Sequence, residues 1–216
     1  MKKIFAIAAV AAAMLFAGKA NAQLNAHVAY APQTYKTTVG SNETSKDYTG
    51  FIGGLSYNIN LSGKLGVSPG FYFQYNTSTD SDGLDLGIVR VSGKSTSTQM
   101  LFAIPVLFNY GFVVKRDIKI APFIGPTFSY AFSGKTKGEG SANFLGIPVG
   151  GESEYDWYGS NAMYKPFSIA LTFGLCADLR DFRLFGGYNL GLLNIDARDN
   201  YTTKGTNWFV GLGYNL

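Results

Sequence analysis

The chain has 216 residues, including 27 Gly, 17 Phe and 14 Tyr, and only 15% are charged, a composition unusual for a soluble domain. Beyond the first 22 residues no apolar run reaches the ~18 residues expected of a spanning helix, which excludes a helical membrane protein. Once the three lysines of those first residues are set aside, 15 Lys and Arg stand against 14 Asp and Glu. That balance excludes the strongly basic surface of a nucleic-acid-binding protein.

The N-terminus has the order of a secretory signal peptide. Two lysines precede an apolar stretch over residues 4–17, and the triplet Ala20-Asn21-Ala22 supplies an A-x-A cleavage site. A single membrane helix is the less favoured alternative, because the stretch is short and lacks a stop-transfer flank. We therefore predict a signal peptide over residues 1–22 and one mature domain over residues 23–216.

The mature chain contains segments that alternate apolar with small or polar residues, the pattern of a membrane barrel strand of about ten residues. In the last of them Trp208, Leu212 and Tyr214 share one face, and Gly211 and Asn215 share the other. The pattern predicts an all-β fold, an eight-stranded antiparallel up-and-down transmembrane β-barrel. In chain order the predicted strands cover residues 24–34, 51–61, 65–76, 98–112, 118–132, 167–176, 183–196 and 208–216.

The predicted connections alternate in length. Tight turns are expected at residues 62–63, 115–117 and 180–181, and longer polar loops at 36–47, 77–97, 134–164 and 199–205. In bacterial barrels the short turns are periplasmic and the long loops extracellular. We therefore expect a bacterial outer-membrane protein with both termini in the periplasm.

The polarity of the strands separates this barrel from a soluble one. A lipocalin-type barrel encloses apolar side chains, whereas here the large apolar residues share the face of Trp208 and Tyr214. In water that face would form one continuous apolar patch. The expected partners are therefore outer-membrane lipid and lipopolysaccharide, with the barrel-assembly machinery during insertion, and we expect a monomer.

Four prolines fall inside predicted strands, although a closed barrel has no edge at which a missing N–H is harmless. They are Pro69, Pro105, Pro122 and Pro126. We expect β-bulges or local widening of the sheet at these positions.

Three segments around those prolines and in the seventh strand carry a family resemblance. They are residues 103–110 (AIPVLFNY), 121–126 (APFIGP) and 187–195 (GYNLGLLNI). They resemble the small outer membrane protein beta-barrel domain, or porin-family, proteins of the Bacteroidetes, over essentially the whole mature chain. In architecture alone the chain resembles the barrels of outer membrane proteins A and X. The resemblance implies the fold and no particular activity.

The interior of an eight-stranded barrel is just wide enough for side chains to fill it. Because Tyr72, Phe123, Phe185 and Phe209 point inward in the predicted register, an open pore is not expected. Three charged residues also face inward beside the tight turns, and buried charges need partners. We therefore predict that Lys119, Asp178 and Arg183 form a salt-bridged plug at the floor of the barrel, with a proton or ion relay as the alternative.

The chemistry expected of an enzyme is missing from the sequence. The one histidine, His27, is predicted in the lumen near the periplasmic end, and no motif places a serine beside it. Lipid A-modifying barrel enzymes use a histidine near the outer leaflet, so His27 is interpreted as a hydrogen-bonded lumen residue. Cys176 is interpreted as a small wall residue. We predict no catalytic residue, no cofactor and no metal site.

The third long loop is the most distinctive one. It contains an apolar segment with Phe144 and Ile147, followed by an acidic and aromatic run with Tyr155, Trp157 and Tyr158. One interpretation extends strands five and six beyond the membrane as a hairpin. The other makes these five residues an extracellular patch for an unknown ligand.

Two function classes remain open. The first is a non-enzymatic surface or structural barrel that binds through its loops, and the second is a small channel for ions or solutes. The occupancy of the lumen distinguishes them. A lipid A-modifying enzyme is a third and weaker alternative.

Overall fold

The computed structural model describes residues 22–85, 89–115, 117–144, 147–158 and 162–216. No helix among these residues is long and apolar enough to cross a membrane. The described part of the chain forms eleven β-strands. They are β1 (Ala22–Tyr30), β2 (Gln33–Val39), β3 (Asn42–Ser62), β4 (Leu65–Asp85), β5 (Val89–Tyr110), β6 (Phe112–Lys115), β7 (Ile118–Phe144), β8 (Ile147–Asp156), β9 (Phe167–Leu179), β10 (Phe182–Gly191) and β11 (Tyr201–Asn215).

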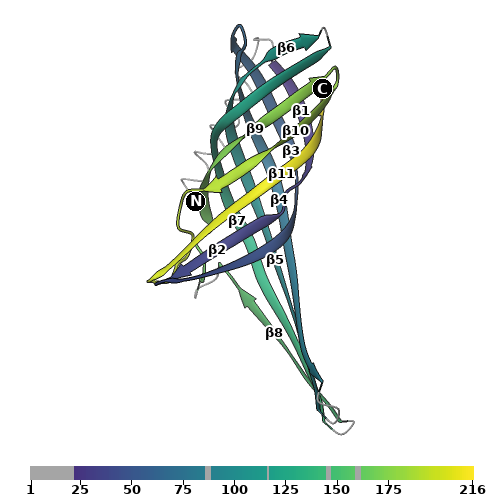
Figure 1. Cartoon of the computed structure of the whole chain (residues 1–216), viewed down its shortest axis with the longest axis vertical. Helices are drawn as coiled ribbons and strands as arrows, with labels where there is room; N and C mark the ends of the chain where they lie inside the picture. Colours follow the sequence, from purple (N-terminus) through teal and green to yellow (C-terminus); the bar gives the residue numbers. More distant parts are fainter. Residues whose placement is uncertain (1–21, 86–88, 116, 145–146, 159–161) are drawn as a thin grey trace.

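These strands close into one antiparallel ring of eight (Figure 1). β1 and β2 together form the first ring strand, interrupted at residues 31–32, and β6 continues β5 past Gly111. The ring then runs through β3, β4, β5, β7, β9, β10 and β11. It closes where β11 pairs with β1, from Asn25 opposite Asn215 to Tyr30 opposite Val210. The prediction of an eight-stranded antiparallel barrel is confirmed.

The two faces of the ring differ as the alternation predicted. On the outer face Val28, Phe51 and Leu212 are 64%, 54% and 59% exposed, which is expected of side chains that contact lipid. On the inner face Asn25 and Asn76 are fully buried. Burial of polar residues inside and exposure of apolar residues outside is the opposite of a soluble barrel.

The prolines interrupt the strand pairing without shifting it. Between β4 and β5 the pairs Pro69–Val106 and Tyr72–Ala103 share one register, and no pairing joins the residues between them. A similar gap separates Pro105–Thr127 from Phe108–Ile124 in the β5–β7 pairing. The register shifts lie elsewhere, at 60–62, 100–101 and 113–115. The prolines therefore leave gaps in the pairing, and the expected bulges do not occur at them.

The tight turns lie together at one end of the barrel, called here the turn end. Gly63 and Arg180 adopt positive φ values of 55°, as two-residue antiparallel turns require. Figure 1 shows β6 and the C-terminus at this end. The opposite end is called the hairpin end.

All four predicted long loops are largely strand, and residues 201–205 of the last one already belong to β11. Residues 36–47 form β2, a turn at Gly40 (φ 60°) and the start of β3. Residues 77–97 and 134–164 are largely strand as well. Conversely, the seventh ring strand ends at Gly191, earlier than predicted, and the irregular loop at the hairpin end spans residues 192–200.

Four strands continue far beyond the ring at the hairpin end (Figure 1). The pairing of β3 with β4 reaches only Thr77, and that of β7 with β9 begins at Tyr130. Past those points β4, β5, β7 and β8 pair with one another alone. This four-stranded sheet, residues 78–85, 89–97, 136–144 and 147–155, is called the extension. The hairpin interpretation of the third loop describes its backbone.

Candidate functional site

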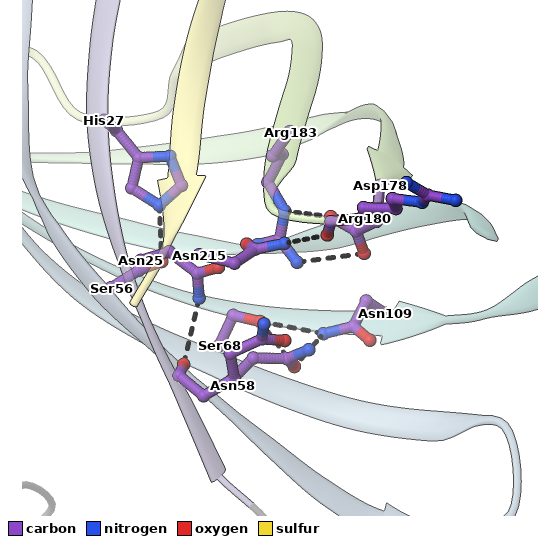
Figure 2. Close-up of polar contacts among 11 residues, drawn as sticks. Asn25, His27, Ser56, Asn58, Ser68, Asn109, Asp178, Arg180, Arg183 and Asn215 are labelled. Atoms are coloured by element: carbon purple, nitrogen blue, oxygen red, sulfur yellow. Dashed lines mark hydrogen bonds and ion pairs between the residues drawn. The ribbon is translucent and has the colours of Figure 1, made fainter. Parts of the chain in front are cut away.

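The lumen at the turn end holds a buried ion pair. Arg183 donates from Nε to Asp178 Oδ1 at 2.6 Å and from Nη2 to Oδ2 at 3.1 Å (Figure 2). The two side chains are 8% and 15% exposed. Both belong to the predicted charge cluster, and the two-pronged geometry fixes their orientation.

Lys119, the third predicted member, lies opposite Asp178 in the β7–β9 pairing. The ion pairs of the described residues include none for Lys119. Its side chain crosses Gly111, where an added Cβ would collide with Lys119 Cε. The structure therefore brings Arg183 and Asp178 into contact and leaves Lys119 beside them.

A layer of amides and hydroxyls lies beside this pair (Figure 2). Asn109 Nδ2 donates to Ser68 Oγ at 2.9 Å, and Ser68 Oγ donates to Asn58 Oδ1 at 3.1 Å. All three residues are under 10% exposed. A satisfied buried network of this kind stiffens the sheet around it.

His27 faces the lumen, and a serine that no sequence motif indicated lies beside it. His27 Nε2 and Ser56 Oγ are 2.6 Å apart (Figure 2). They meet because β1 pairs with β3, where Asn25 lies opposite Ser56 and His27 opposite Gly54. The contact spans 29 residues of sequence, and only the strand register could have revealed it.

The surroundings of His27 are those of a packed side chain. Its ring contacts Tyr72 and Phe185 edge-on, with centroids 5.7 and 5.1 Å away. Its Nδ1 has no hydrogen-bond partner among the described residues. A histidine that activates a serine is normally oriented through Nδ1 by a third group, and the described residues supply none here.

Aromatic side chains cross the middle of the lumen. Phe123 and Phe209 are 9% and 8% exposed, with ring centroids 6.4 Å apart, and Phe185 packs against Phe209 at 6.1 Å. Cys176 is among the partly buried residues that pack against this cluster. A cavity of about 140 Å³ lies among the lumen side chains. Its lining includes Arg183 at the turn end and Tyr158 at the hairpin end.

A second polar and aromatic layer lies in the lumen at the hairpin end. Tyr35 donates its hydroxyl to Gln99 Oε1 at 2.7 Å, and Gln99 Nε2 donates to the Tyr158 hydroxyl at 2.7 Å. Trp157 is 5% exposed and donates from Nε1 to Thr136 Oγ1 at 2.8 Å. Its ring meets Tyr48 edge-on at 6.0 Å.

The predicted extracellular patch is therefore divided. Trp157 is buried and Tyr158 lines the lumen cavity, whereas Tyr155 is 40% exposed on the extension. Phe144 and Ile147 pair with each other where β7 meets β8, and their side chains lie outside the described ones. The residues do not form one surface patch, because the Trp157 ring packs inward against Tyr48 while Tyr155 stays exposed.

A buried carboxylate organises the loop at residues 192–200, a feature that the sequence analysis missed. Asp196 receives Arg198 Nε and Nη2, each at 2.9 Å, and the Thr203 hydroxyl at 2.7 Å. Burial alone would raise the pKa of Asp196, but these hydrogen bonds outweigh burial and hold its pKa below the ordinary value. The Asn-x-Asp-x-Arg spacing at 194–198 is the sequence feature from which this hydrogen-bonded loop could have been predicted.

The extension carries many exposed polar residues, among them Asp80, Asp82 and Glu152. Its residues include six Asp and Glu and three Lys and Arg, a net charge of −3. Lys137 and Glu154 pair across β7 and β8 at 3.4 Å. Within the described residues no group of three or more His, Cys, Asp or Glu is placed to hold a metal ion.

A closed eight-stranded ring with an apolar exterior and buried polar side chains in its interior defines the class of membrane β-barrels. The chain belongs to the family described as outer membrane protein beta-barrel domain, whose model matches residues 18–197. Membership places it in the bacterial outer membrane.

Solved structures add a likeness in fold. Similar ones include Ail of Yersinia pestis in complex with the heparin analogue sucrose octasulfate (13% identity, 90% of this chain and 99% of that one, TM-score 0.36). Neisserial surface protein A (12%, 92% and 99%, 0.39) and a major outer membrane protein of Thermus thermophilus (12%, 91% and 100%, 0.39) are also similar. At these identities and TM-scores the likenesses carry no argument about function. No curated protein sequence matches the chain.

Proposed function

We propose that this protein is a non-enzymatic surface barrel whose extension presents a binding surface to an extracellular partner. The observation that carries the proposal is the continuation of β4, β5, β7 and β8 beyond the ring. In this proposal the turn end and both termini are periplasmic, and the extension lies outside the cell. Lipopolysaccharide of the outer leaflet surrounds the barrel, which acts as a monomer inserted by the barrel-assembly machinery.

The extension suits a binding role because its outermost strands keep free edges. Within the described residues, β8 pairs only with β7, and β4 beyond Thr77 pairs only with β5. Unpaired N–H and C=O groups at such an edge can add a strand from another chain. The net charge of −3 favours a basic or neutral partner.

Trimming both hairpins tests this proposal. Thr79 faces Thr96, and Lys137 faces Glu154, so a short turn can replace the residues between each pair. Cells carrying the trimmed barrel should lose retention on at least one of a panel of immobilised extracellular proteins and polysaccharides. Equal retention of trimmed and wild-type cells on every surface would contradict a binding role for the extension.

The channel alternative is disfavoured by the contents of the lumen. Arg183 and Asp178 occupy one end, Phe123 and Phe209 the middle, and Tyr158 the other end. The wild-type protein in planar bilayers should therefore give no conductance steps. Regular steps from the wild type would make it a channel.

Two finer proposals accompany this one. The segments at 103–110, 121–126 and 187–195 favour a Bacteroidetes-type porin-family member. The lipid A-modifying alternative is disfavoured because the His27–Ser56 pair faces the lumen at the turn end rather than lipid.

A further inference from the structure

The outer rim of the turn end carries an aromatic and basic cluster that the surface-binding function does not use. It lies where β6 continues β5 beyond the ring (Figure 1). Phe112, Val113 and Val114 are 47%, 71% and 58% exposed. Phe112 continues the lipid-facing belt, because its ring contacts that of Tyr110, with centroids 4.8 Å apart.

A β-bulge in β6 decides where the next lysine points. Phe112 lies opposite Ile120 and Val113 opposite Lys119, but the register then shifts so that Lys115 lies opposite Ile118. Residues directly opposite in an antiparallel pair share a face, and Ile118 is in phase with the outward-facing Ile120. The bulge therefore turns Lys115 to the lipid side, a common use of bulges.

A second lysine, Lys64, lies in the neighbouring turn between β3 and β4. The carbonyl oxygen of Lys64 accepts the N–H of Gly111 at 2.7 Å, which ties the β3–β4 turn to the start of β6. The Lys64 Nζ lies over the Phe112 ring, 5.8 Å from its centroid. Lys64 thus lies beside Phe112, and the strand register places Lys115 on the same outer face of β6.

Both ammonium groups lack an acidic partner in the described part of the chain. The ion pairs found there include neither Lys64 nor Lys115. At the same end the neighbouring Arg180 pairs with Asp117 at 3.3 Å. Two exposed cations beside apolar rings that continue a lipid-facing belt complement a phosphate group that carries acyl chains.

We propose that the outer rim formed by Lys64, Phe112 and Lys115 binds the headgroup of an anionic phospholipid. The phosphate lies between the two ammonium groups, and an acyl chain runs along Phe112 and Tyr110. Which leaflet supplies the lipid rests on the proposed orientation, in which the turn end faces the periplasm. The binding itself is independent of the extension and its partner.

Native mass spectrometry of protein refolded into mixed phosphatidylglycerol and phosphatidylcholine vesicles tests the proposal. Lys64→Gln/Lys115→Gln should lower retained phosphatidylglycerol by about tenfold or more and leave retained phosphatidylcholine unchanged. Lys64→Arg/Lys115→Arg should retain the lipid. A matched control, Lys94→Gln/Lys204→Gln, removes two exposed lysines away from this rim and should have no effect.

Two outcomes would overturn the proposal: unchanged retention in the first variant, or an equal loss in the control, which would indicate non-specific charge attraction. Acetylation of the wild type provides a second measurement should a variant fail to fold. Lys64 and Lys115 should be protected relative to Lys94 in phosphatidylglycerol vesicles and not in phosphatidylcholine vesicles. Equal reactivity in both would also contradict the site. None of these assays contains an extracellular partner, so their failure is distinguishable from failure of the surface-binding function.

Discussion

At the scale of single residues, the lumen is built from polar contacts that join neighbouring ring strands. The Thr172 hydroxyl contacts Thr127 Oγ1 at 2.5 Å and donates to Asn189 Oδ1 at 2.6 Å, which links β7, β9 and β10. Leu171, the adjacent residue, is on the opposite face of β9. One step along the strand therefore separates a lipid contact from a buried hydrogen bond.

Substitutions at these two positions test the register. An Arg facing lipid near mid-membrane costs about 2–4 kcal/mol, so Leu171→Arg should lower the unfolding free energy in vesicles by that amount. Leu212→Arg, on a residue 59% exposed, should behave alike. Thr172→Ser keeps the hydroxyl and should cost under about 1 kcal/mol. Urea titrations of refolding into lipid vesicles measure all three, and wild-type stability in both Arg variants would contradict the lipid contact.

The ion pair at the turn end leads to a second prediction. Removing one partner of a buried pair leaves the other charge uncompensated and costs about 3–5 kcal/mol. Asp178→Leu should therefore be strongly destabilising. Asp178→Leu/Arg183→Met should recover most of the loss in the same titrations, because two apolar side chains leave no buried charge. A double variant as unstable as the single one would show that the pair stabilises the barrel through contacts beyond its charges.

At the scale of elements, the loop at residues 192–200 closes part of the hairpin end around one carboxylate. Asp196 bridges to Tyr164, and the N–H of Lys165 donates to the carbonyl of Ile195 at 2.7 Å. The loop lies beyond Trp208, the outermost large aromatic residue of β11 on the lipid side. Its order therefore depends on hydrogen bonds rather than on lipid contact.

Acid should weaken this loop. The pKa of Asp196 is lower in the folded protein than in the unfolded chain, so the stability it contributes is present above about pH 4 and is lost as pH falls through the folded value. Asp196→Asn should cost about 1–3 kcal/mol at neutral pH. That difference from wild type should shrink as the pH falls below about 4. Urea unfolding at a series of pH values gives the comparison, and a difference independent of pH would exclude the carboxylate as its origin.

The elements that the sequence predicted well are those with two different environments on their two faces. In β11, Leu212 faces lipid and Gly211 faces the lumen, so the alternation of apolar and small residues revealed the strand and its register. The extension has water on both faces, and nothing selects alternation in residues such as Ser95 or Gly140. It was therefore predicted as loops. The His27–Ser56 contact could be predicted only from the pairing of β1 with β3. The inward orientation of Trp157 could not be predicted from the alternation of residues along a strand.

At the scale of the whole molecule, the ring separates two ends of different character. The hairpin end carries the acidic extension, and the turn end carries Lys64 and Lys115 on its rim. Trypsin added to intact cells should therefore cut at Lys94 and Lys137 and spare Lys115. Lysed cells provide the control in which Lys115 is cut. Mass spectrometry of the released peptides identifies the sites, and cleavage at Lys115 alone on intact cells would reverse the proposed orientation.

The pairing of β1 with β11 also governs how the protein can fold. Asn25 and Asn215 stand opposite each other although almost the whole described chain separates them. Until the last strand arrives, β1 and β10 each present a row of unpaired N–H and C=O groups, and each such group costs several kcal/mol in hydrocarbon. A chain shortened before β11 therefore has no stable membrane-inserted form. Insertion must be completed by the final strand, which makes the C-terminal residues the ones that commit the chain to the membrane.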